Sequence, residues 1–233
     1  MVRYLTNLLR AACFLGLWFS AFPGVGQTVA PPIAEYRGKI QGMFELKNDG
    51  DVPLAVILEV HGFQVSEQGN ILYGDLDPAI RVELGESSFV IPPHGSHFVF
   101  YKARVEKPDA WFTILSTLTK AASDANRMRI NFVLPHVVYL YQKPKLKKED
   151  VEVAVLPGTK PGEYTLAVQN HSAKLGRVEG VTWQGCETKG EYGGFPMFPS
   201  GKRLIPMQTG TLAANAAVKV TFQDGFSVQV PMQ

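Results

Sequence analysis

Residues 127–144 read Arg-Met-Arg-Ile-Asn-Phe-Val-Leu-Pro-His-Val-Val-Tyr-Leu-Tyr-Gln-Lys-Pro, and no other stretch of this 233-residue chain carries a clearer structural signal. In its first half every second side chain is apolar, and successive side chains of a β-strand point to opposite faces of the sheet. The predicted strand therefore has one wholly apolar face, formed by Met128, Ile130, Phe132 and Leu134. It is also longer than the usual strand of about five or six residues. By frequency, such a strand buries one face in the core of its own domain.

Short runs of alternating apolar residues recur on both sides of this stretch. Turn-forming sequences separate the runs, among them Asn48-Asp49-Gly50, Pro92-Pro93-His94-Gly95, Pro157-Gly158, Gly190–Gly194 and Asp224-Gly225. Runs of this length and spacing predict an all-β chain with two immunoglobulin-like β-sandwich domains. We place the break between them in the lysine-rich stretch 143–150, which gives an N-terminal domain over residues 27–145 and a C-terminal domain over residues 146–233.

One segment fits two kinds of secondary structure. Residues 109–125 place Trp111, Leu115 and Leu118 at near-helical spacing, and the segment ends in an alanine-rich stretch. The local pattern alone favours a helix and a strand followed by a loop about equally.

The N-terminal residues 1–26 have the pattern of a secretory signal peptide. Arg3 and Arg10 precede or open an apolar run, and small residues surround Gly24. We predict that residues 1–26 are removed on export, and that no later segment inserts stably in a membrane, because none is long and apolar enough. Removing the two arginines changes the balance from 23 Lys and Arg against 21 Asp and Glu to 21 against 21. A chain without a basic surplus predicts no nucleic-acid partner.

The sequence contains no motif that is typical of catalysis, metal binding or nucleotide binding. The histidines are scattered, and the closest two, His94 and His97, flank a turn. We therefore predict a protein that is not an enzyme and that has no metal and no cofactor. Cys13 leaves with the signal peptide, so Cys186 is alone in the mature chain and has no partner for an internal disulfide. We expect its thiol to be buried as a small apolar group.

A series of motifs resembles the PapD-like periplasmic pilus chaperones of the chaperone–usher family. They occur in the family's order: residues 44–50 with the Asn-Asp turn, the Pro-Gly turn at 91–96, residues 111–114, the long strand with its Lys-Pro ending at 143–144, and residues 164–170 and 198–201. The resemblance covers nearly the whole mature chain. It also assigns residues 109–125 to a strand and a loop.

The resemblance implies that the protein is a chaperone in the periplasm with pilus subunits and an outer-membrane usher as partners. Such a chaperone supplies the β-strand that a subunit lacks, pairing main chain with main chain and filling the subunit's groove with alternate side chains. On this chain Met128, Ile130 and Phe132 fall on the groove-filling positions. Leu134 extends the row, and Pro135 interrupts the hydrogen-bond ladder just beyond it.

The family also binds the subunit's terminal carboxylate through basic residues, and here the sequence departs from its pattern. The strand position is Val137, with His136 beside it, and the first arginine after the signal peptide is Arg37. This region is the candidate carboxylate anchor. Two other classes of protein fit the residues: a two-sandwich binding protein of the periplasm or cell surface without a chaperone role, and a secreted hydrolase without a recognisable motif.

Overall fold

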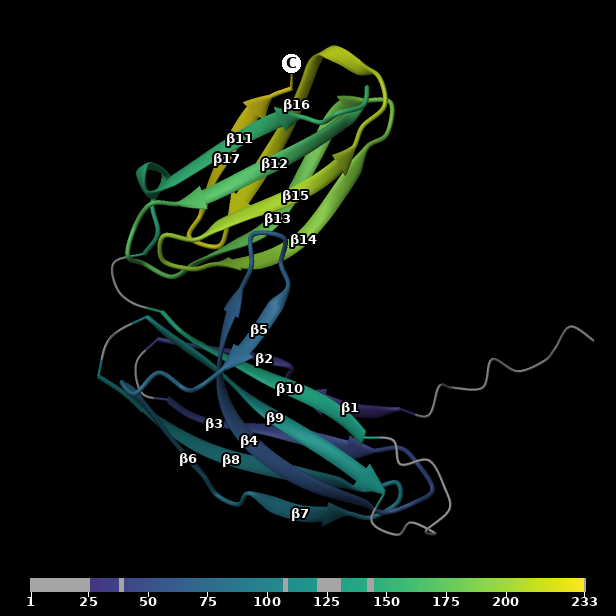
Figure 1. The fold of residues 1–233 in the computed structure, drawn as a ribbon, viewed down its shortest axis with the longest axis vertical. Coiled ribbons are helices and arrows are strands. Elements are labelled where there is room, and N and C mark those ends of the chain that lie inside the picture. The colour runs from purple at the N-terminus through teal and green to yellow at the C-terminus, as the bar shows by residue number, and fades with distance from the viewer. Residues whose placement is uncertain (1–25, 38–39, 107–108, 121–130, 142–144, 233) are drawn as a thin grey trace, which may run out of the picture.

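The computed structural model describes residues 26–37, 40–106, 109–120, 131–141 and 145–232. Within them the chain forms two β-sandwiches in succession, and Figure 1 shows that they join at an angle, so that the molecule is bent. The prediction of an all-β chain with two sandwich domains is confirmed. Of the predicted signal peptide, residues 1–26, only Gly26 lies among the described residues. No described helix is long and apolar enough to cross a membrane.

The first sandwich consists of two sheets. The first sheet has the order β1-β3-β8-β6, with β1 Gln27–Ala30, β3 Ile40–Asn48, β8 Ser96–Val105 and β6 Ile80–Leu84. The second has the order β2-β10-β9-β4-β5, with β2 Ile33–Tyr36, β10 Asn131–Leu140, β9 Ala110–Lys120, β4 Leu54–Val65, β5 Ile71–Gly74, and with β7 Ser88–Ile91 paired to β4. The ambiguous segment is thus a strand over the described residues 110–120, which pairs with β10 on one side and with β4 on the other and has mostly buried or half-buried side chains.

The core of the first sandwich comes from alternate residues of these strands. Phe44 and Leu46 of β3 face Phe112 and Ile114 of β9, and all four side chains are almost completely buried. Burying apolar area in this way contributes about 25 cal/mol per Å². The alternation that predicted strands from the sequence is therefore the same alternation that forms the core.

The second sandwich also has two sheets. One has the order β11-β12-β15, with β11 Val151–Pro157, β12 Glu163–Asn170 and β15 Lys202–Gln208. The other has the order β14-β13-β16-β17, with β14 Gly190–Met197, β13 Gly176–Cys186, β16 Leu212–Phe222 and β17 Phe226–Pro231, and a 3-10 turn, η1 Lys148–Asp150, precedes β11. The prediction of a turn at Gly190–Gly194 is wrong. These residues pair with β13, and the ring of Trp183 occupies the space where a side chain of Gly190 would be.

Both sandwiches use a buried asparagine to fix the same kind of turn. In the first, Asn48 at the end of β3 is fully buried. Its amide nitrogen donates to the carbonyl oxygens of Val52, Ile91 and Pro92 at 2.9, 3.4 and 3.0 Å. Its side-chain oxygen accepts from the backbone N–H of Gly50 at 3.0 Å. One side chain therefore satisfies groups of two loops that would otherwise be buried without partners.

Asn170 at the end of β12 repeats this arrangement in the second sandwich. It is fully buried, and its amide nitrogen donates to the carbonyl oxygens of Lys174, Met197 and Phe198 at 2.7, 3.4 and 3.0 Å. The backbone N–H of Ser172 donates to its side-chain oxygen at 3.0 Å. The two domains thus share this detail of hydrogen bonding as well as an architecture.

Cys186 lies at the end of β13 and is half-buried, so the expectation of a fully buried thiol is only partly met. Its sulfur is 3.8 Å from the sulfur of Met232, and burial raises the pKa of the thiol. We expect Cys186→Ser to change the free energy of unfolding by less than about 1 kcal/mol, because the site is already partly hydrated. Urea unfolding followed by circular dichroism would measure the difference. A change of several kcal/mol would contradict this expectation.

Candidate functional site

The outer edge of β10 is the clearest feature available for binding. Over its whole length β10 pairs with β9, but on its other side β2 pairs only with Val137–Leu140. No described strand pairs with residues 131–136 on that side. Unpaired N–H and C=O groups at a sheet edge are a template for a strand from another chain.

The direction of the backbone groups on this edge follows from two hydrogen bonds. The N–H of Val137 donates to Pro32 at 2.8 Å, on the side of β2, and the hydroxyl of Thr113 on β9 donates to the carbonyl oxygen of His136 at 3.3 Å. Since backbone groups alternate along a strand, the odd-numbered residues face the free edge. Pro135 therefore lies where its missing N–H costs the sheet nothing, and the free edge offers only a carbonyl oxygen there.

The apolar face of β10 divides into a buried part and an exposed part. Val138 is fully buried in the core, and Leu134 is half-buried against it. Phe132 is 42% exposed and Val133, on the other face, is 52% exposed. Met128 and Ile130 lie outside the described residues. Of the four predicted groove-filling residues, Leu134 packs against the protein's own core and Phe132 is exposed to solvent.

His136 joins the free edge to the core through a chain of hydrogen bonds. The imidazole is fully buried and stacks on Phe44, with ring centroids 4.4 Å apart. Its Nδ1 is 2.7 Å from the carbonyl oxygen of Pro31, which can only accept, so Nδ1 carries the hydrogen. Its Nε2 then accepts from the hydroxyl of Tyr101 at 2.9 Å, and Tyr101 accepts from Tyr36 at 3.0 Å. Burial lowers the pKa of His136, so the ring is neutral in this network.

The lowered pKa of His136 predicts a dependence of stability on pH. In the unfolded chain the imidazole of His136 has a pKa near the ordinary value of 6.5, whereas in the folded chain its pKa is lower. The contribution of neutral His136 to the free energy of unfolding is therefore fully present above pH 6.5, and it is lost as the pH falls from 6.5 towards the pKa of the folded state. We expect the urea midpoint of the first sandwich to fall between pH 7.5 and pH 5, by about 1 M or less. His136→Phe should flatten this slope, and His94→Gln, at an exposed position, should leave it unchanged.

The three residues of the candidate carboxylate anchor lie in different surroundings. His136 is enclosed, as described above. Val137 is half-buried and faces the cleft between the sandwiches. The guanidinium of Arg37 lies 5.5 Å above the ring of Tyr141 and 3.5 Å from the carboxylate of Asp224 in the second sandwich. Carboxylate binding at these residues stays a prediction.

An aromatic row on the second sheet faces the second sandwich. Tyr139, Trp111, Phe63 and Tyr73 occupy neighbouring positions on β10, β9, β4 and β5. Phe198 of the second sandwich packs on this row, with its ring centroid 4.8 Å from that of Trp111 and 6.0 Å from that of Phe63. Burial raises the pKa of Tyr139 to about 12, as expected for a phenol within this contact. The row holds the two domains together.

The hairpin of β4 and β5 adds a second link between the domains (Figure 1). The N–H of Leu204 donates to the carbonyl oxygen of Glu67 at 2.8 Å, and the guanidinium of Arg203 donates to that of Ser66 at 3.4 Å. Gly69 has φ +90° and faces the Arg203 guanidinium, so that a side chain there would be strained and would collide with it. The alternating runs of the sequence did not predict β5. Its signal was the turn sequence Gln68-Gly69-Asn70 followed by three large apolar residues.

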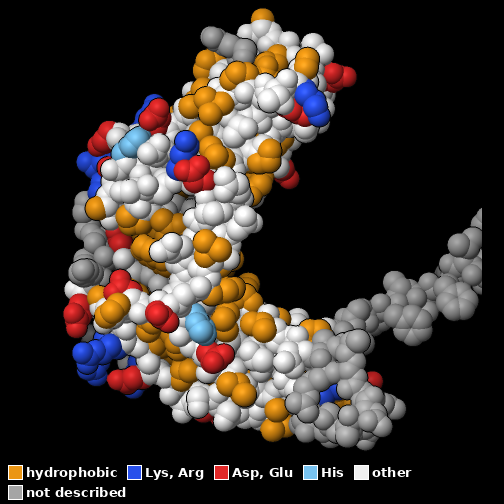
Figure 2. All heavy atoms as spheres, viewed as in Figure 1, with side chains coloured by type: hydrophobic (Ala, Val, Ile, Leu, Met, Phe, Trp, Pro, Cys, Tyr) orange, Lys and Arg blue, Asp and Glu red, His pale blue; other side chains and the backbone are white. Residues whose placement is uncertain are grey.

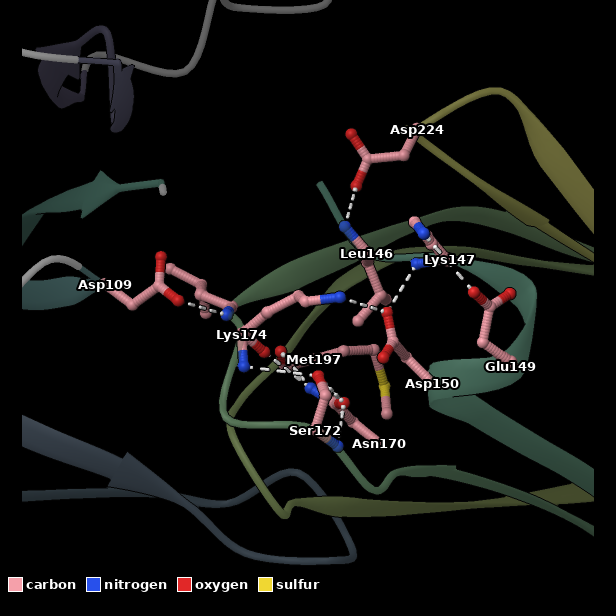
Figure 3. A network of polar contacts seen from close by, with 11 residues as sticks. Asp109, Leu146, Lys147, Glu149, Asp150, Asn170, Ser172, Lys174, Met197 and Asp224 are labelled. Atoms are coloured by element: carbon pink, nitrogen blue, oxygen red, sulfur yellow. Dashed lines mark hydrogen bonds and ion pairs between the residues drawn. The ribbon is translucent and has the colours of Figure 1, made fainter. Parts of the chain in front are cut away.

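Polar bonds fix the linker as well, and Figure 3 shows them. The N–H of Leu146 in the linker donates to the carboxylate of Asp224 at 3.1 Å. The N–H of Leu175 in the second sandwich donates to the carboxylate of Asp109 in the first at 2.9 Å. Among the residues that the structure describes, no group of three or more His, Cys, Asp and Glu could hold a metal ion. The described part of β10 offers unpaired backbone groups at its edge and exposed apolar side chains.

These features define a class: two β-sandwiches joined at an angle, with an incompletely paired edge strand in the first. Neither the protein-family models nor the curated proteins gave a match to the chain. Solved structures did. The YadV chaperone has a TM-score of 0.54 and 12% sequence identity, over 88% of this chain and 97% of that one.

Two similar structures contain partners. The CsuC–CsuE chaperone–tip adhesion subunit pre-assembly complex, from the archaic chaperone–usher Csu pili of Acinetobacter baumannii, matches with a TM-score of 0.53 and 12% identity, over 89% of this chain and 100% of that chain. The Salmonella enterica SafA pilin in complex with the SafB chaperone matches with a TM-score of 0.53 and 8% identity, over 91% of this chain and 99% of that chain. At these identities the likeness concerns the fold. The chain has the two-domain fold of the fimbrial chaperones.

Proposed function

We propose that this protein is a periplasmic chaperone that binds fimbrial subunits by pairing its strand β10 with an incomplete subunit sandwich. The observation that carries the proposal is the free edge at residues 131–136, next to the exposed Phe132. An edge of this kind is a liability in a protein without a strand-pairing partner. It becomes useful when the partner lacks one strand of its own.

Both components of strand pairing are available on β10. Asn131 and Val133 turn their backbone groups to the free edge and form main-chain hydrogen bonds, which give affinity. Phe132 enters the partner's groove, and Met128 and Ile130, which precede it at alternate positions of the sequence, enter the groove as well. Pro135 ends the paired segment on the side of the cleft, because it offers no N–H.

The partners follow from the same fold. The matched CsuC–CsuE and SafA–SafB structures contain a tip adhesion subunit and a pilin beside their chaperones, and we extend this type of partner to the present chain. An outer-membrane usher that receives the loaded chaperone is the second proposed partner. The proposal involves no enzymatic step.

Co-expression with the fimbrial subunits of its own genome tests the proposal. The protein without residues 1–26 should co-purify with at least one subunit as a one-to-one complex from the periplasm. A cysteine introduced at Val133, with Cys186 replaced by serine, should form a disulfide with a cysteine placed in the subunit's groove edge. A folded protein that binds no subunit of its genome would support the binding-protein alternative instead.

A further inference from the structure

A small cavity lies between the sandwiches, next to the cleft end of β10. It has a volume of about 150 Å³ and is lined by Val137, Tyr139, Ile71, Tyr73, Val65 and Phe195 together with neighbouring residues. These residues come from β10, from both strands of the β4–β5 hairpin and from β14. Figure 2 shows hydrophobic side chains on the concave side of the bend. The volume is enough for one side chain of the size of leucine or phenylalanine.

The lining of the cavity is mostly apolar and therefore favours an uncharged ligand. Arg203 is the only charged residue among the described residues that line the cavity. Its Nη2 donates to the hydroxyl of Tyr192 at 3.2 Å, its Nη1 binds the hairpin, and its guanidinium lies 5.8 Å above the ring of Phe195. Its Nε is enclosed by protein atoms, so that a ligand does not reach it, and it has no hydrogen-bond partner. Arg203 therefore forms part of the cavity lining and connects the hairpin to the second sandwich.

Apolar surface remains exposed at this cavity. Ile71 is 49% exposed and Tyr73 48%, although each has a face towards the cavity. Pockets that bind ligands occur preferentially between domains and are mostly apolar with few polar groups. Exposed apolar surface next to a preformed pocket is best covered by a ligand that is itself apolar.

The position of the cavity identifies its occupant. Val137 lines it and is also the residue at which β2 begins to pair with β10, so the free edge ends at the cavity. A chain that pairs with the free edge and continues past Pro135 arrives there. We propose that the cavity is a binding site for one large, uncharged apolar side chain of the client, contributed by the segment next to the strand that pairs with β10. This proposal rests on the proposed chaperone function and adds a selectivity: at Val137 an apolar residue of the client is recognised in place of the carboxylate that the resemblance assigns to this position.

A small probe tests the cavity without any strand pairing. N-acetyl-L-phenylalaninamide should bind the protein without residues 1–26 with a dissociation constant on the order of 1 mM, as judged from its size. Its titration should shift the NMR signals of Ile71 and Val137 methyl groups. N-acetylglycinamide should produce no shifts, and N-acetyl-L-phenylalanine, which carries a carboxylate, should bind no more tightly than the amide.

Two variants fill the cavity from opposite sides. Val137→Phe and Ile71→Trp should each weaken binding of the phenylalaninamide about tenfold or more, because the added atoms occupy its space. Val90→Phe enlarges an exposed residue of the first sandwich that lies outside the cavity and outside β10, and it should leave binding unchanged. Circular dichroism establishes that each variant is folded, and since Ile71 is half exposed, its variant tolerates the larger ring even if Val137→Phe does not.

The outcomes separate this proposal from the chaperone function. It is overturned if the phenylalaninamide gives no shifts at Ile71 and Val137, if both filling variants bind it normally, or if N-acetyl-L-phenylalanine binds more than about tenfold more tightly in a manner that Arg203→Gln abolishes. It is also overturned if both filling variants capture a subunit as well as the unmodified protein does. Failure of the chaperone function appears differently, as a protein that binds the probe and captures no subunit.

Discussion

Phe132→Asp is expected to abolish capture of a fimbrial subunit while the protein stays folded. Phe132 is 42% exposed, so a carboxylate at this position remains hydrated in the free protein. In the complex the carboxylate would enter an apolar groove without a partner, which costs about 3 kcal/mol or more. That cost corresponds to a loss of affinity of roughly a hundredfold. Co-purification with the subunit and circular dichroism on the same preparation measure both effects.

Two further variants make this experiment specific. Phe100→Asp places the same change on the outer face of the other sheet, at a side chain that is 60% exposed, and should leave capture unchanged. Leu134→Asp, two residues along β10, should unfold the first sandwich, because Leu134 packs against its core. If Phe132→Asp unfolds the protein as Leu134→Asp does, the strand serves only its own domain. If it is folded and captures normally, Phe132 is not part of the interface.

Asn170→Ala is expected to give the largest loss of stability of any single change in the second sandwich that removes no apolar volume. The alanine leaves three carbonyl oxygens, those of Lys174, Met197 and Phe198, without the amide that now serves them. We expect the free energy of unfolding to fall by about 3 kcal/mol. For a domain of this size the melting temperature should then fall by about 10 °C or more.

Differential scanning calorimetry compares this variant with two others. Asn48→Ala removes the corresponding side chain of the first sandwich and should cost a similar amount, because its bonds are equivalent. Asn215→Ala changes an exposed residue of the same domain and should have little effect. Asn170→Ala with an unchanged melting temperature would falsify the role that we assign to this turn.

The sequence was sufficient for the class of fold and for the location of the edge strand. Alternation of apolar residues is visible in a single sequence over residues 128–134, and the structure describes residues 131–134 of this run as part of β10. It was not sufficient for Gly190–Gly194, since glycine marks turns in general and only the position of the Trp183 ring shows why it is needed within a strand. Nor did it reveal that Leu134 and Phe132 have different environments, because periodicity identifies a face and does not show how far the core extends along it.

The cleft was the least predictable part of the molecule. Its walls include β5 and residues around Phe198 and Arg203, which are far from β10 in the sequence. No local pattern indicates that Trp111 contacts Phe198, or that the hairpin reaches β15. Contacts between domains depend on the angle of the linker, and bonds such as that from Leu175 to Asp109 determine this angle only once both sandwiches exist.

The link between the hairpin and Arg203 has a consequence for the order of folding. Ser66 and Arg203 are 137 residues apart in the chain. During synthesis an N-terminal domain generally folds first, and contacts between distant residues form slowly. We expect the first sandwich to form its own core before β15 has left the ribosome or the export channel. Until then the hairpin lacks its hydrogen bonds to β15. The cleft is thus completed last, and a chain that ends before β15 would keep its edge strand and lack the cavity beside it.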